Sequence, residues 1–252
     1  SQKLDSSIKR NTGFIKRLKQ GINKESKQSL LKDLSEVSLE KYLSEITNTA
    51  AEGLSNVGNK NEDVIAAVEV VSGLHQRFNA RFTCGVFELY LNNFTTSADD
   101  STVEKEGLAK STKLKGNLRV LTELYLVGIF TSLDKVSSKE ALPSFLQRRV
   151  NKKEPLLLPI LKETLNYKFK LGFSMAIATS FVKRFPFFFD NEDTSLNVCI
   201  FDNDLKGSLQ ALFKVFTEAV FARALELDSK VKKLYKEHQK CQFRTGKSTD
   251  EY

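Results

Sequence analysis

The histidines and cysteines are the side chains best suited to chemistry, and they are few and scattered. The two histidines are His75 and His238, and the three cysteines are Cys84, Cys199 and Cys241. Cys84 follows His75 by nine residues, which on one continuous helix would place the two side chains on opposite sides. Neither histidine accompanies a nucleophile signature, and no H-E-x-x-H or clustered cysteine pattern predicts a metal site. The sequence therefore predicts no catalytic residue, no metal site and no cofactor.

Gly246-Lys247-Ser248 resembles the end of a phosphate-binding loop. That loop requires a glycine five residues before its final glycine, and position 241 is Cys. It also requires a preceding strand and a following helix. We therefore expect no nucleotide site and no small-molecule substrate.

Basic residues gather in three blocks of a chain whose net charge is +8. Residues 1–24 hold seven basic groups and one acid, residues 148–184 hold nine and two, and residues 228–247 hold seven and two. Helical projection places two sets of these cations opposite an apolar stripe: Lys9, Arg10, Lys16 and Arg17, and Lys232, Lys233, Lys236 and Lys240.

Each set is a candidate contact for RNA or for an acidic protein, and the plain alternative is a solvated helix face. Aromatic residues are not interleaved with these charges, so there is no sign of base stacking. Bound RNA would be held by its phosphates, without sequence preference and with strong salt dependence.

Two further arginines are expected to form ion pairs. Arg223 lies within an apolar stripe, which predicts a buried stem and a carboxylate partner on a neighbouring helix. The alternative is that it lines a functional groove. Arg119 and Glu123 are four residues apart and are predicted to pair with each other.

Apolar residues recur at steps of three and four along most of the chain, which predicts an all-α fold. We expect about ten helices, over residues 3–20, 25–36, 38–53, 61–78, 79–94, 113–132, 138–150, 155–170 and 172–184, and from residue 203 onward. In the last helix, Leu205 to Tyr235 supply one continuous apolar face. The helix 113–132 is apolar on every side from Leu124 to Phe130, so it should lie in the middle of a stack. Pairs of about 40 residues favour a HEAT-like α-solenoid of about five antiparallel hairpins, and a compact helical bundle is the alternative.

The organisation expected is one domain over residues 1–240, followed by a disordered tail over residues 241–252. Residues 95–111 are polar and should form a surface loop, either a tolerated insertion or a place for regulatory phosphorylation. No apolar run approaches the ~18 residues needed to cross a bilayer. The chain has no signal peptide, begins without Met, and has no disulfide framework. We therefore expect a piece of a longer intracellular protein.

Three segments resemble the first middle domain of the up-frameshift-two family of nonsense-mediated mRNA decay factors, whose domains are of the initiation factor 4G middle-domain type. The yeast members are the most similar. The central segment is Asn117-Leu118-Arg119, with Glu123-Leu124 and Val127-Gly128-Ile129-Phe130. The others are Leu4-Asp5-Ser6-Ser7 with Lys9, Asn11, Thr12, Phe14 and Leu18, and Leu74-His75-Gln76-Arg77-Phe78.

The resemblance implies a non-enzymatic scaffold domain in a cytoplasmic, polysome-associated protein that bridges the other two up-frameshift factors. The best-known partner-binding residues of that family lie in other domains, so none is carried over to this chain. The loop at 95–111 departs from the family pattern. Sequence-nonspecific RNA binding by the basic helix faces is the alternative function.

Overall fold

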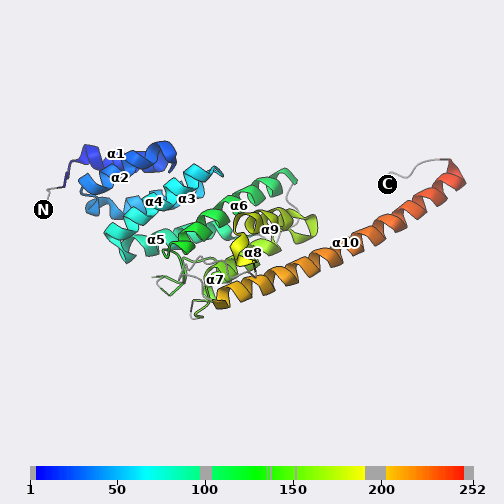
Figure 1. Ribbon diagram of the computed structural model, residues 1–252. Helices are drawn as coiled ribbons and strands as arrows, with labels where there is room; N and C mark the ends of the chain where they lie inside the picture. The colour runs from blue at the N-terminus through cyan, green and yellow to red at the C-terminus, as the bar shows by residue number, and fades with distance from the viewer. Residues whose placement is uncertain are drawn as a thin grey trace.

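The computed structural model is an array of helices, and it describes residues 4–96, 104–134, 136, 138–150, 152–190 and 203–246 (Figure 1). The α-helices are α1 Ile8–Gln20, α2 Lys24–Glu36, α3 Leu43–Ser55, α4 Asn61–Phe78, α5 Ala80–Tyr90, α6 Glu104–Leu126, α7 Ser144–Gln147, α8 Leu157–Asn166, α9 Phe173–Arg184 and α10 Asn203–Thr245. Four short 3-10 helices join them: η1 Glu40–Tyr42, η2 Leu91–Phe94, η3 Phe169–Leu171 and η4 Pro186–Phe188. The predicted all-α, HEAT-like architecture is confirmed.

The helices stack in two rows. α1 packs against α3 and α3 against α5, while α2 packs against α4. Each hairpin thus covers the apolar face of the next one, which is how a helical-repeat protein builds a continuous core. In the described part of the chain, no helix combines the length and apolarity that a membrane crossing needs.

The central helix is α6, which contacts α3 and α4 as well as α8 and α9. Leu114, Leu118, Val120, Leu121 and Leu124 are all buried. The predicted position of this helix in the middle of the stack is therefore confirmed.

The predicted end of this helix at residue 132 is wrong. Gly128 has φ +80°, and its N–H donates to the Tyr125 carbonyl at 2.9 Å. The Ile129 N–H donates to the Leu124 carbonyl at 3.0 Å. These two bonds form a glycine-capped helix end, after which the chain turns and the buried Phe130 ring packs edge-on against Phe87.

Several other predicted boundaries also differ. α6 begins at Glu104, so the polar loop expected over 95–111 is shorter, and part of it lies outside the described residues. The helices predicted over 138–150 and 155–170 are reduced to α7 and α8. α10 continues to Thr245, five residues into the expected tail, and residues 247–252 lie outside the described residues.

Among the described elements, α10 packs through its first part against α8 and η4. Leu205, Leu209 and Phe213 are buried, and Phe213 stacks on Phe181 with ring centroids 5.6 Å apart. The rest of α10 projects beyond the other helices (Figure 1). The apolar face predicted for this helix is therefore buried at its start but not in its second half, where the large apolar side chains are exposed: Leu227, Val231, Leu234 and Tyr235.

One buried carboxylate joins the first two helices. Asp33 of α2 is only 5% exposed, and it accepts hydrogen bonds from Arg10 at 2.8 Å and from Arg17, both on α1. Arg10 also donates to Glu36 at 2.9 Å. Because Asp33 is removed from water, losing an arginine partner would leave a poorly solvated charge.

We predict that Arg17→Ala lowers the free energy of unfolding by about 1–3 kcal/mol. Lys16 is the neighbouring cation, and it is exposed, so Lys16→Ala should stay within about 0.5 kcal/mol of the unsubstituted protein. Urea denaturation followed by circular dichroism measures both. Equal effects would mean that the Asp33 contacts do not stabilise the fold.

The close approach of α3 and α5 depends on a glycine. A Cβ added at Gly85 of α5 would lie 2.7 Å from the γ-methyl of Thr47 on α3. Thr47 is buried, and its hydroxyl donates to the Leu43 carbonyl at 2.8 Å. The methyl is one bond from the β-carbon of a β-branched side chain, so it has little room to move.

Gly85→Ala should therefore destabilise the protein by about 1–2 kcal/mol, because overpacking outweighs the gain in helix propensity. Adding Thr47→Ser, which removes the methyl, should restore most of that loss. A thermal-denaturation double-mutant cycle measures this coupling. Additive effects of the two substitutions would contradict the steric explanation.

Candidate docking surfaces

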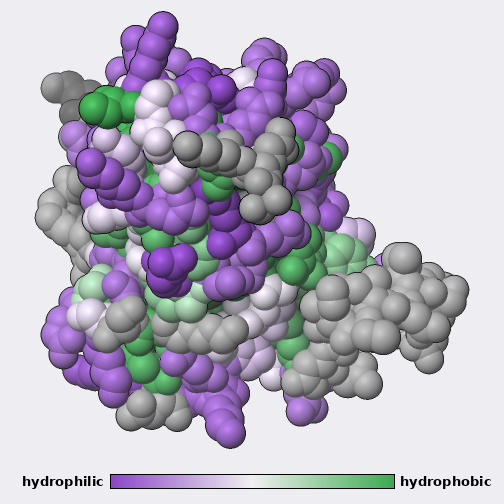
Figure 2. Space-filling view, turned by 90° about the vertical axis from the view of Figure 1, so that its left-hand side faces the viewer, coloured by the Kyte–Doolittle hydropathy of each residue, from purple (hydrophilic) through white to green (hydrophobic). Residues whose placement is uncertain are grey.

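The first predicted basic face is only partly available. Lys9 and Lys16 are exposed, whereas Arg10 and Arg17 are bound to Asp33. Carboxylates therefore neutralise half of this face, which a projection of α1 alone does not show. Figure 2 looks onto this end of the molecule, and its visible surface is mostly hydrophilic with small separate hydrophobic patches.

The second predicted basic face lies on the projecting part of α10. Lys232, Lys233, Lys236 and Lys240 are all exposed, and Lys232 is paired with Asp228 at 2.7 Å. α1 and the far end of α10 lie at opposite ends of the molecule (Figure 1). The structure therefore does not bring the two predicted faces together into one site.

His75 and Cys84 lie closer to each other than the sequence predicted. The helix breaks at Asn79, which has φ +51°, and both side chains line one pocket of about 310 Å³. The His75 Nδ1 lies 2.6 Å from the Thr83 hydroxyl. The expectation that His75 and Cys84 point to opposite sides is therefore wrong, because it assumed one continuous helix.

Both predicted arginine pairs are also wrong. Arg223 binds Glu226 at 2.7 Å, and this carboxylate is on the same helix, not on a neighbour. Arg119 does not pair with Glu123. It donates instead to the Asn59 carbonyl and to the Asn61 side-chain oxygen, both at 2.6 Å.

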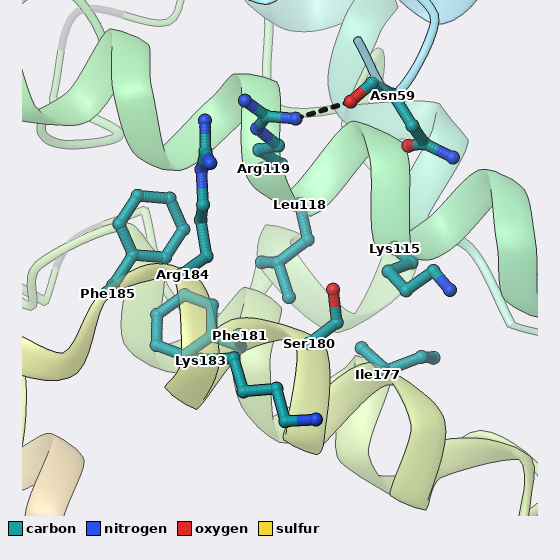
Figure 3. Close-up of a pocket in the computed structure, with 10 residues that line it drawn as sticks. All are labelled: Asn59, Lys115, Leu118, Arg119, Ile177, Ser180, Phe181, Lys183, Arg184 and Phe185. Carbon is teal, nitrogen blue, oxygen red and sulfur yellow. Dashed lines mark hydrogen bonds between the residues drawn. The ribbon is translucent and has the colours of Figure 1, made fainter. Parts of the chain in front are cut away.

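Arg119 belongs to a basic pocket that the sequence did not reveal. The pocket, of about 400 Å³, lies between α6 and α9 beside the loop that precedes α4 (Figure 3). Its floor is apolar and buried, while its rim is polar and basic. The lining residues are Asn59, Lys115, Leu118, Arg119, Ile177, Ser180, Phe181, Lys183, Arg184 and Phe185.

The rim arginines come from different helices, and Figure 3 shows Arg119 reaching the Asn59 carbonyl. Arg184 of α9, like Arg119 of α6, donates to the Asn61 side-chain oxygen. Among its described residues the pocket has four cations, Lys115 and Arg119 on α6 and Lys183 and Arg184 on α9. More than 60 positions of the sequence separate Arg119 from Lys183. Two local signs were present: the i, i+4 spacing of Lys115 and Arg119, which places them on one side of a helix, and the basic block 148–184, which contains Lys183 and Arg184.

Such a pocket can bind an anion, because Arg and Lys side chains are the donors that bind phosphate and carboxylate groups. The ionisable side chains among its described lining residues are all lysines and arginines, with no carboxylate, histidine or cysteine beside them. The described residues contain no group of three or more His, Cys, Asp or Glu that could hold a metal.

Comparison with known proteins identifies the family. A model of the MIF4G domain matches residues 8–236. The chain is 60% identical over all its 252 residues to "Nonsense-mediated mRNA decay protein 2" of Saccharomyces cerevisiae, of which it spans 23%. It is 33% identical over 135 residues to human "Regulator of nonsense transcripts 2". That match covers 54% of this chain and 10% of the human protein.

The fold comparison agrees with the sequence comparison. The N-terminal mIF4G domain of S. cerevisiae Upf2 superposes with a TM-score of 0.91 and 60% identity, covering 99% of this chain and 80% of that one. Yeast Upf2 is involved in the degradation of mRNAs that contain premature stop codons. The chain therefore belongs to the MIF4G domain family, and within it is a homologue of the yeast nonsense-mediated mRNA decay protein Upf2.

Proposed function

We propose that this chain is a non-enzymatic scaffold domain of a nonsense-mediated mRNA decay factor and that it binds protein partners of the surveillance complex. The observation that carries the proposal is the 60% identity to the S. cerevisiae decay protein over the whole chain. The fold is shared as well, since the yeast domain superposes with a TM-score of 0.91.

The architecture supports a scaffold role. Stacked helical hairpins present a long rigid surface on which several partners can dock at once. The basic pocket between α6 and α9 offers donors for an anionic partner, and the outer part of α10 offers a separate exposed surface. In the full-length protein we propose contact with the other up-frameshift factors, in a cytoplasmic, polysome-associated complex.

RNA binding is a second candidate function, and one observation favours it. Lys233, Lys236 and Lys240 are exposed along the projecting part of α10. Lysines on such a free helix could follow an RNA backbone without reading its bases. The α1 face contributes less, because Asp33 holds Arg10 and Arg17.

The scaffold proposal is tested by exchange. The matching segment of full-length S. cerevisiae Nonsense-mediated mRNA decay protein 2 is replaced by this chain, and a reporter mRNA with a premature stop codon is followed. We expect rapid reporter decay and co-purification of the other up-frameshift factors. A version lacking the segment is the control. Normal protein levels with a stable reporter would contradict the proposal.

The RNA alternative is tested by titrating the domain with a labelled oligouridine at about 50 and 200 mM salt, where phosphate contacts differ strongly in strength. If α10 binds RNA, Lys233→Glu with Lys236→Glu and Lys240→Glu should abolish binding at the lower salt. Lys9→Glu with Lys16→Glu is the control on α1. Absence of binding at the lower salt excludes this function.

A further inference from the structure

The basic pocket between α6 and α9 carries uncompensated positive charge. The ten described residues that line it include four cations and no carboxylate. By contrast, the hollow between α1 and α2 combines its cations with Asp5, Asp33 and Glu36. The positive charge of the α6–α9 pocket is therefore available to bind a ligand. On α1, by contrast, carboxylates of the fold neutralise much of the positive charge.

Among the described residues, the acceptors that the two arginines of this pocket meet are neutral. Arg119 and Arg184 both donate to the single side-chain oxygen of Asn61, and Arg119 also donates to the Asn59 carbonyl. The buried Nε of Arg119 has no hydrogen-bond partner in the described structure. An amide oxygen does not neutralise a guanidinium, so an anion would be a stronger acceptor at the same place.

The acidic side chains that follow Asn61 in sequence have other partners. In the first turn of α4, Glu62 accepts a hydrogen bond from the Lys24 ammonium at 2.9 Å, and Asp63 accepts one from the Lys24 backbone N–H at 3.1 Å. Glu123 lies one turn beyond Arg119 on α6, and burial raises the pKa of its carboxyl. The described residues that line the pocket therefore include no competing carboxylate.

The shape of the pocket favours a compact anion over a polynucleotide. Phe181 and Phe185 form part of its floor but are buried, at 3% and 2% exposed, so no ring is open for a base to stack on. A single multiply charged group on a protein segment meets this condition, because it needs no ring to stack on.

We propose that this pocket binds a phosphoryl group carried by a serine or threonine of a protein partner. Paired arginines with flanking lysines are the donor set that recognises phosphorylated side chains. A phosphoryl group has three acceptor oxygens, enough to engage Arg119, Arg184 and a lysine at once. The inference rests on the proposed scaffold function, which supplies the reason to expect a protein ligand.

The test uses a labelled glycine-rich peptide with one central phosphoserine, and the same peptide with serine or with glutamate at that position. Binding is measured by fluorescence anisotropy, and the amide signal of Ser180 is followed by NMR. We expect binding of the phosphopeptide only, with a shift of that signal. The double substitution Lys183→Gln with Arg184→Gln should weaken binding by at least about tenfold, because it removes at least one charge-assisted hydrogen bond to the phosphoryl group.

The matched control is Lys16→Gln with Lys19→Gln, which removes the same charge from exposed positions on α1 and should leave affinity nearly unchanged. Equal loss in this control, equal binding of the glutamate peptide, tighter binding of oligouridine at the same residues, or no binding of any probe would each overturn the proposal. Peptide binding does not require mRNA decay. Binding together with a failed exchange experiment would therefore contradict only the scaffold function.

Discussion

The packing of α6 is the constraint on which the rest of the structure depends. This helix contacts α3 and α4 of the first half and α8 and α9 of the second. Its buried side chains, including Leu118, Val120 and Leu124, cover more than one side. A close-packed helix of this kind cannot rotate or slide without disturbing both halves. The core therefore sets the position of Arg119, and with it the positive charge of the pocket between α6 and α9.

The sequence predicted the existence and order of the main helices, because their apolar residues recur with helical period. It predicted their ends less well. The apolar run through Phe130 continues past the last turn of α6, where Gly128 and its carbonyl contacts stop the helix. The first turns of α6 were missed because they are polar and their large apolar residue, Leu108, is 60% exposed. The periodicity of apolar residues reflects which face of a helix is buried, so it cannot detect a helical turn that is exposed to water.

The candidate site was less predictable than the fold, because ion pairs between distant segments decide which charges are available. Projection of α1 grouped Arg10 with Lys9, yet only the arginine reaches Asp33 on α2. In the same way, Arg119 has a carboxylate four residues away but donates to the Asn59 carbonyl, in the loop before α4, and to Asn61, at the start of α4. The pocket exists only where α6 and α9 meet, so no local pattern could assemble its four cations.

The projecting part of α10 is a long arm whose tip moves much further than its base when the helix tilts. A helix rises about 1.5 Å per residue, so the stretch after Phe216 extends roughly 44 Å from its last packed turn. A tilt of about 5° at that base would move its tip by roughly 4 Å. The base is held by aromatic contacts of Phe213 with Phe181 and Phe189, and of Phe216 with Phe169. Small repacking of these rings is thereby converted into a large displacement at the far end of the arm.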